Sequence, residues 1–132
     1  MEDTQRMQWL RRILLVKVVL CFVAWGVPAL WASPALLAWF GLTVPEDPLF
    51  LRSFGALVVA IGVAYWYAYR DPLRNVAILR VGVVDNALAT LIVLFTALTS
   101  GLSSWFVGLT GLLTAGFLAA FLFLMPADPG KQ

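Results

Sequence analysis

Four long apolar segments, separated by short polar ones, follow one another along the chain. They cover about residues 13–31, 49–69, 76–98 and 105–125. Each holds about 20 residues, and a helix of that length, rising 1.5 Å per residue, crosses the hydrocarbon core of a bilayer. The pattern therefore predicts an all-α integral membrane protein, with residues 1–132 forming a single transmembrane domain built as a four-helix bundle.

A short apolar segment lies between the first two of these spans. Ser33 is a favoured N-cap residue and Pro34 a favoured first helical residue. Residues 35–40 are apolar but too few to cross a bilayer, and Gly41 follows them. Residues 43–48 then hold two prolines and two acids, which is typical of a loop. We predict a short interfacial helix between helices 1 and 2.

The first span also fits a secretory signal peptide, because basic residues precede an apolar run. Three features oppose that alternative. Lys17 lies inside the run, the run is long, and cleavage after Ser33 would leave Pro34 as the first residue. We therefore interpret the first span as a retained helix.

The basic residues predict the orientation of the helices. If both termini are cytoplasmic, Arg52 alone among the basic residues lies on the far side, together with Glu46 and Asp47. This asymmetry is what the positive-inside rule expects. The basic residues then on the cytoplasmic side are Arg6, Arg11, Arg12, Lys17, Arg70, Arg74, Arg80 and Lys131. Aromatic residues agree: Trp31, Trp39 and Trp105 mark one interface, and Trp9 with residues 65–69 marks the other.

Small residues recur at helical spacing in three of the spans. In lipid, close packing of small residues carries helix association, because apolar burial gives no preference for helix over hydrocarbon. We predict packing faces at Ala56, Ala60, Ala64, Ala68, Gly82, Gly108, Gly111 and Ala115. The competing interpretation is that glycine and alanine are simply common in transmembrane helices. Whether such faces pack within one chain or against another protein is left open.

Composition supports the membrane class and narrows the chemistry. The chain is 62% hydrophobic and 12% charged, whereas soluble domains average about 45–50% apolar and about 25% charged. We expect membrane lipids as partners. Because the net charge is only +2 and no basic cluster is present, nucleic acid is not an expected partner.

Cysteine and histidine counts limit the possible cofactors. With no histidine and one cysteine, the chain alone offers no intrachain disulfide, no Cys–His zinc site and no Ser-His-Asp triad. A haem, pigment or metal bound through histidine is likewise excluded for this chain alone. The aromatic residues could line a site for a quinone, carotenoid or lipid, but interfacial anchoring is the favoured explanation. The cofactor is therefore unknown.

Asp85 is the residue that most needs an explanation. It lies about ten residues into the third span, where an acid costs about 2.5–3.5 kcal/mol to insert. Together with Asn86, Lys17 and Arg80 it forms the candidate intramembrane polar site. A functional interpretation is a proton relay, an ion site or an anchor for a polar ligand.

The structural alternative for Asp85 is an ion pair, or a carboxyl group kept protonated by desolvation. We favour it, because a relay normally needs several acids or histidines in series. Arg80 lies about 140° around the helix from Asp85, so Lys17 is the better partner. Arg80 is expected to extend to the cytoplasmic surface.

Residues 52–75 carry a resemblance to a known group. The residues concerned are Arg52, Phe54, Gly55, Gly62, Tyr65, Arg70, Asp71, Pro72 and Arg74. This segment, about a fifth of the chain, resembles the second helix and following turn of small bacterial four-helix membrane proteins called DoxX-like. The resemblance implies four helices and a place in the bacterial inner (cytoplasmic) membrane. Some members are linked to redox enzymes as membrane partners, and no catalytic residue transfers.

Three functions are compatible with these observations, and a non-enzymatic role is favoured. The first is a non-catalytic accessory or scaffold subunit of a larger membrane complex, for example one of respiratory or photosynthetic electron transfer. The second is a small oligomeric carrier or channel that uses Asp85 and Asn86. The third is a membrane partner of a redox enzyme, or a membrane-embedded enzyme that itself uses a bound redox cofactor. The first asks least of the residues present, and it predicts other membrane protein subunits as partners.

Overall fold

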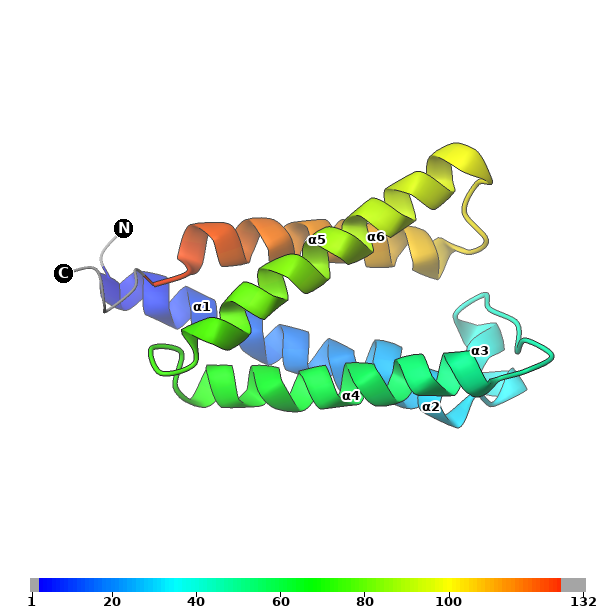
Figure 1. Cartoon of the computed structure of the whole chain (residues 1–132), viewed down its shortest axis with the longest axis horizontal. Helices are drawn as coiled ribbons and strands as arrows, with labels where there is room; N and C mark the ends of the chain where they lie inside the picture. The colour runs from blue at the N-terminus through cyan, green and yellow to red at the C-terminus, as the bar shows by residue number, and fades with distance from the viewer. Residues whose placement is uncertain (1–2, 127–132) are drawn as a thin grey trace.

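The computed structural model describes residues 3–126 and is built from helices throughout that range (Figure 1). Four helices are long and apolar enough to cross a membrane, and the predicted all-α, four-helix architecture is confirmed to that extent. Their bounds are Asp3–Trp31, Leu49–Arg70, Val76–Thr99 and Trp105–Leu124. Three of them match the predicted spans closely. The first begins at Asp3 rather than near residue 13, because the polar N-terminal segment continues the same helix. Most of the predicted polar tail lies outside the described residues.

The first long helix contains a widened turn that lets it continue through a proline. Pro28 has no N–H to donate and its ring clashes with the carbonyl four residues back. Just before it, Val27 N bonds to Phe22 O, five residues back, in a π-helical turn. The helix then runs on until Ala32, whose left-handed backbone (φ 51°) ends it. The three parts are α1 (Asp3–Leu20), η1 (Cys21–Gly26) and α2 (Val27–Trp31).

The predicted short helix between the first two spans is present as α3 (Pro34–Trp39). Ser33 occupies the N-cap position with extended backbone, but its side chain makes no capping hydrogen bond. The expected side-chain cap is therefore wrong, and the fixed φ of Pro34 remains as the local cause of the helix start. Gly41, with φ +67°, turns the chain away after α3.

Two tight turns join the last three helices, α4 (Leu49–Arg70), α5 (Val76–Thr99) and α6 (Trp105–Leu124). In the first turn Asp71 Oδ1 accepts from Arg74 N at 3.2 Å, and Asn75 Nδ2 donates to Asp71 O at 2.8 Å. In the second turn Ser104 caps α6, accepting from Val107 N at 3.3 Å. Both turns thus satisfy backbone groups that helix termini leave unpaired.

The helices form two pairs whose relation changes along the molecule (Figure 1). The first long helix runs beside α4 over its length, and α5 packs on α6. Near the turn of residues 71–75, α5 lies close to α4, and towards its other end it diverges from α4. We call the end that holds Asp3, this turn and the last described residues the terminal end. The opposite end, which holds α3 and the turn of residues 100–104, is the α3 end.

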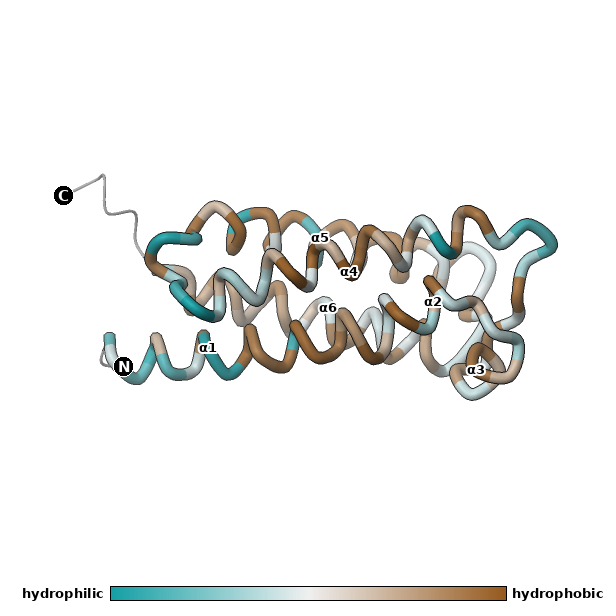
Figure 2. Tube along the Cα trace, turned by 90° about the horizontal axis from the view of Figure 1, so that it is seen from below, coloured by the Kyte–Doolittle hydropathy of each residue, from teal (hydrophilic) through white to brown (hydrophobic). Residues whose placement is uncertain are grey.

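The outer surface of the long helices is apolar, unlike the surface of a soluble protein. Large apolar side chains are exposed on every long helix, for example Val23, Leu57, Ile92 and Leu112. Figure 2 shows apolar residues along the middle of the helices and polar residues towards their ends. Inside, by contrast, Lys17 is 3% exposed and Asn86 is fully buried.

Burial divides the small residues of the predicted packing faces into three groups. Gly82, Gly111 and Ala68 are buried. Ala64, Gly108 and Ala115 are partly buried, whereas Ala56 and Ala60 are exposed. The alanine stripe of α4 splits because a four-residue spacing drifts by about 40° per step around a helix with 3.6 residues per turn.

The backbone of α4 instead comes close to that of the first helix at Gly55. A Cβ atom there would lie 2.7 Å from Gly26 O and 2.9 Å from the carbonyl carbon of Ala29. The missing side chain thus lets two backbones touch, as small residues do between membrane helices.

Candidate functional site

A buried ammonium group lies at the centre of the four helices. Lys17 Nζ donates to Asn86 Oδ1 at 2.6 Å and lies 3.7 Å from Asp85 Oδ2. Aromatic rings surround it, with centroids 4.8 Å away for Phe117, 5.2 Å for Trp25 and 5.6 Å for Tyr65. Cation–π attraction and the hydrogen bond together compensate part of the cost of burying this charge.

The local sequence explains why this lysine is inside. Leu10, Leu14, Lys17 and Cys21 follow one another at spacings of four, three and four residues, and all four are buried. Side chains at these spacings share one face of a helix. Lys17 therefore sits on the apolar stripe by which α1 packs into the bundle, and its stem contributes to that packing.

Asn86 is satisfied on both atoms of its amide group. Its oxygen accepts from Lys17, and its Nδ2 donates to Gly82 O at 2.6 Å. Its backbone oxygen accepts from Thr90 Oγ1 at 2.7 Å, and that hydroxyl lies 3.0 Å from Thr114 Oγ1 on α6. Asn86 thus connects α1 to α5, and Thr90 carries the connection on to α6.

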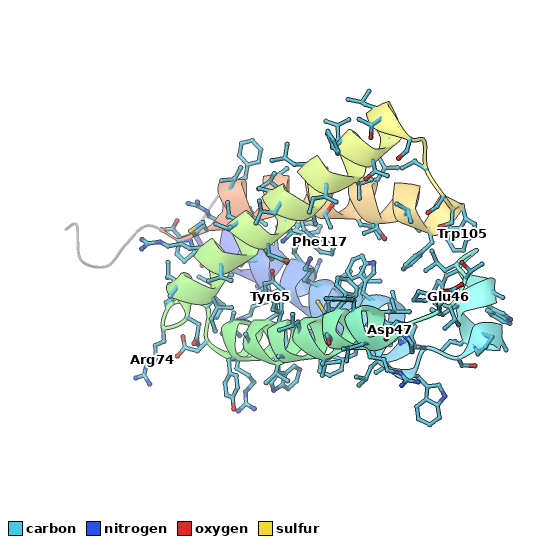
Figure 3. The ribbon with its side chains drawn as sticks, turned by 45° about the vertical axis from the view of Figure 1, so that its right-hand side comes forward. Glu46, Asp47, Tyr65, Arg74, Trp105 and Phe117 are labelled. Atoms are coloured by element: carbon cyan, nitrogen blue, oxygen red, sulfur yellow. The ribbon has the colours of Figure 1, made fainter. Side chains whose placement is uncertain are left out.

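Asp85 connects the same network to α4. Its Oδ2 accepts from Tyr65 OH at 3.1 Å, and its side chain is 33% exposed. Tyr65 is 1% exposed and packs against the ring of Phe121, with centroids 5.8 Å apart. In Figure 3, Tyr65 and Phe117 lie between the helices. Side chains from all four long helices therefore meet around Lys17 and Asp85.

The structure brings together three of the four predicted site residues. The expected pairing of Lys17 with Asp85 is confirmed at 3.7 Å. Arg80 lies on the exposed side of α5, apart from this network. The closest partner of Lys17 Nζ is the amide oxygen of Asn86 rather than a carboxylate oxygen of Asp85. Asn86 is fully buried on the inner face of α5, whereas the Asp85 side chain is partly exposed.

Tyr65 was expected at a membrane interface with the other aromatics of residues 65–69, and for Tyr65 that is wrong. Its place about three turns from the buried Gly55 and about one turn from the buried Gly62 would have indicated the inner face. Trp66 and Tyr67 are exposed, as expected for interfacial residues.

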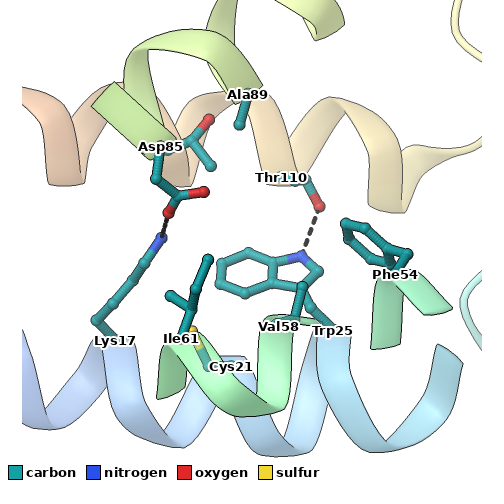
Figure 4. Close-up of a pocket in the computed structure, with 10 residues that line it drawn as sticks. Lys17, Cys21, Trp25, Phe54, Val58, Ile61, Asp85, Ala89 and Thr110 are labelled. Atoms are coloured by element: carbon teal, nitrogen blue, oxygen red, sulfur yellow. Dashed lines mark hydrogen bonds and ion pairs between the residues drawn. The ribbon is translucent and has the colours of Figure 1, made fainter. Parts of the chain in front are cut away.

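A cavity of about 80 Å³ adjoins the buried charges (Figure 4). Lys17, Asp85, Thr110 and Thr114 give it a polar side. The indole of Trp25 forms another part of the wall, with Nε1 donating to Thr110 Oγ1 at 2.9 Å. The rest is lined by Cys21, Phe54, Val58, Ile61 and Ala89. None of these residues except the charged pair entered the sequence-based site, because no local pattern marks a cavity wall.

The chemistry available here is hydrogen bonding to a small molecule or to water. The cavity presents a cation that only donates and a carboxylate that only accepts. Within residues 3–126, no group of three or more metal-binding Cys, Asp or Glu side chains comes together.

Comparison with protein-family models, with curated proteins and with solved structures finds no match to this chain. The resemblance of residues 52–75 to DoxX-like proteins therefore stays a prediction.

Proposed function

We propose that this chain is a multi-pass protein of the bacterial cytoplasmic membrane and a non-catalytic accessory subunit of a larger membrane complex. The membrane placement is supported by the exposed apolar side chains on all four long helices and by the polar residues inside them. In water, exposed apolar surface of this extent would favour aggregation. In lipid, the same surface is already solvated.

Charged and aromatic residues support an orientation with both termini at the cytoplasmic face. Exposed arginines cluster towards the terminal end, namely Arg11, Arg12, Arg70 and Arg74. Glu46 and Asp47 lie at the α3 end, as Figure 3 shows. The tryptophans predicted for that interface, Trp31, Trp39 and Trp105, are all exposed. The distribution agrees with the positive-inside rule.

The accessory role rests mainly on the outer half of α5, residues 88–99. Its contact with the rest of the chain runs through α6, where Val93 packs on Gly111. Around most of its circumference it exposes large apolar side chains: Leu88, Leu91, Ile92, Leu94, Phe95 and Leu98. Within the described residues, this half of α5 packs on α6 and diverges from α4. This arrangement leaves room beside it for a helix of another subunit. The exposed Ala56 and Ala60 give α4 a second smooth surface for such contact.

The carrier hypothesis receives less support from the geometry. Asn86 is buried with both amide atoms bonded, so it lines no passage, and Lys17 lies between it and Asp85. A membrane partner of a redox enzyme is a particular case of the accessory role.

Mild purification from the native membrane, followed by mass spectrometry, tests the proposal. We expect the chain to come out in fixed stoichiometry with larger membrane proteins. Replacing Phe95 and Leu98 together by alanine should weaken that association. The matched control replaces Leu122 and Phe123 by alanine. They are a similarly exposed Leu–Phe pair in the last turn of α6, at the terminal end. Recovery of the wild-type chain alone, or as a homo-oligomer, would contradict the accessory role.

A further inference from the structure

The polar side of the central cavity has hydrogen-bonding capacity that the protein leaves unused. Asp85 makes its contacts to Tyr65 and Lys17 through Oδ2. Within the described part of the chain, its Oδ1 accepts no hydrogen bond, although an ionised carboxylate has about four acceptor sites. Lys17 Nζ has three donors, and one of them is taken by Asn86.

Lys17 and Asp85 together determine which polar group of a ligand can bind in this cavity. A donor-only cation and an acceptor-only carboxylate, 3.7 Å apart, face one space. A ligand carboxylate or phosphate would be attracted by Lys17 but repelled by Asp85, and an amine would be attracted by Asp85 but repelled by Lys17. A carbonyl oxygen would use Lys17 alone. A neutral hydroxyl group both accepts and donates, so it satisfies both residues at once.

The remaining walls are apolar and fit a hydrophobic body. Val58 and Ile61 of α4 face Ala89 of α5 across the cavity. The polar edge of Trp25 is already used by Thr110, so the indole offers its carbon surface. The volume of about 80 Å³ exceeds the roughly 10–15 Å³ that one water requires.

The cavity also has a way out that is not polar. Phe54, which lines it, is 51% exposed on α4. It belongs to the first turns of α4, which begins at the α3 end, and α4 and α5 diverge towards that end in Figure 1. In Figure 4 Phe54 stands beyond Trp25, on the side of the cavity away from Lys17. A molecule longer than the cavity would extend past Phe54 into the surrounding apolar phase.

We infer that this cavity binds a neutral lipophilic molecule with a hydroxyl head, such as a phenol bearing an alkyl tail. The hydroxyl oxygen accepts from Lys17 Nζ and its hydrogen is donated to Asp85 Oδ1. The tail leaves between α4 and α5 past Phe54. This site belongs to the single chain and does not depend on the accessory role.

Two probes that differ in one hydrogen-bond donor test the inference. The purified chain in detergent is titrated with 4-nonylphenol and with its methyl ether, which partition similarly into micelles. Thermal unfolding reports binding as a rise in the midpoint temperature. We expect the phenol to bind about tenfold or more tightly than the ether, because the ether leaves Asp85 without its partner. Equal effects of the two probes would overturn the inference.

Cavity-filling variants locate the site without touching the charged pair. Ala89→Leu fills the cavity from α5, and Ala97→Leu adds the same atoms at an exposed position of the same helix. We expect Ala89→Leu to abolish the difference between the probes and Ala97→Leu to retain it. Val58→Phe, with Val63→Phe as its exposed counterpart, repeats the test from α4 if Ala89→Leu does not fold. A phenol preference that survives in both filled variants would place the binding elsewhere and refute the assignment.

Discussion

The terminal end and the α3 end are held together by different kinds of contact. From the terminal end to the middle, polar bonds cross between helices. Arg6 Nη2 donates to Met125 O at 2.7 Å, where it also meets the negative end of the α6 dipole. Lys17 and Asp85 then tie α1, α4 and α5 together. Towards the α3 end one polar bond, from Trp25 Nε1 to Thr110 Oγ1, still crosses between helices. Beyond it the contacts are apolar, such as the rings of Phe40 and Phe106 at 4.7 Å.

This difference explains why the bundle closes at one end and opens at the other. In lipid, apolar side chains gain nothing from meeting each other rather than acyl chains, so directional polar bonds and close backbone contact decide which helices stay together. Where α5 carries Asp85 and Asn86, it is fixed to α1 and α4. Beyond Thr90 its side chains are apolar apart from Thr96 and Thr99, whose hydroxyls bond to their own helix. Among the described helices, α6 is therefore the one that supports this half of α5.

Removing the buried cation should have the largest effect. Lys17→Met leaves the Asn86 amide oxygen without its donor and the Asp85 carboxylate without its ion-pair partner, although Tyr65 still donates to Asp85. Breaking a buried ion pair costs about 3–5 kcal/mol. Because the Asp85 side chain is 33% exposed, we expect the lower end, about 3 kcal/mol of unfolding free energy. Denaturant titration in mixed micelles measures it.

The double variant Lys17→Met with Asp85→Asn is the control for this loss. It removes the unpaired charge as well as the cation, so it should be more stable than Lys17→Met alone. Equal stability of the two variants would show that Asp85 does not depend on Lys17.

The α3 end depends instead on the backbone contact at Gly55. Substituting this glycine should have the second largest effect on the free energy of unfolding. Gly55→Ala places a methyl group against Gly26 O and the backbone of Ala29, neither of which can swing aside. We expect a loss of about 2 kcal/mol, as for overpacked sites, measured by the same titration.

Gly116→Ala on α6 is the matched control for Gly55→Ala. A methyl group at Gly116 meets nothing within 4 Å in the described residues. This substitution should stabilise by up to about 1 kcal/mol, because alanine is the better helix former. If Gly116→Ala also lowers the free energy of unfolding, the loss in Gly55→Ala cannot be assigned to the backbone contact at Gly55.

The features that the sequence could predict were those set by length, hydropathy and single charges. The four spans need only a count of apolar residues, and Lys17 and Asp85 had to find partners because each lies inside a span. The pairing with Lys17 rather than Arg80 followed from the angle between Arg80 and Asp85 around α5.

The features that the sequence could not predict depend on which face of each helix packs against which neighbouring helix. Tyr65 belongs to an aromatic cluster that looks interfacial, yet its position one turn from Gly62 puts it inside. The alanines of α4 look like one stripe, yet only Ala68 is buried. Trp25 and Thr110 are 85 residues apart, and only the folded chain brings these two side chains of η1 and α6 together.

Tyr65→Phe tests the hydrogen bond from Tyr65 on α4 to Asp85 on α5. The phenyl ring can keep its contact with Phe121, and only the hydrogen bond to Asp85 is lost. A hydrogen bond to a charged group is worth about 1.5 kcal/mol at the low end, and we expect that loss. Tyr67→Phe, at an exposed position of the same helix, should change stability little. Equal effects of the two substitutions would mean that the Asp85 contact adds nothing.

The smallest expected effect separates two serines at the α3 end that look alike in the sequence. Both Ser33 and Ser104 precede a helix, but only the Ser104 side chain accepts a hydrogen bond, from Val107 N at 3.3 Å. Ser104→Ala should therefore cost about 0.5–1 kcal/mol of unfolding free energy, at the lower part of the range for lost caps because the bond is long. Ser33→Ala should cost close to nothing, since Pro34 rather than a side-chain cap sets the start of α3. Because α6 is the main support of the outer half of α5 within residues 3–126, weakening the first turn of α6 should also raise amide hydrogen exchange in residues 88–99. If Ser33→Ala costs as much as Ser104→Ala, then α3 is capped in a way that its backbone geometry does not explain.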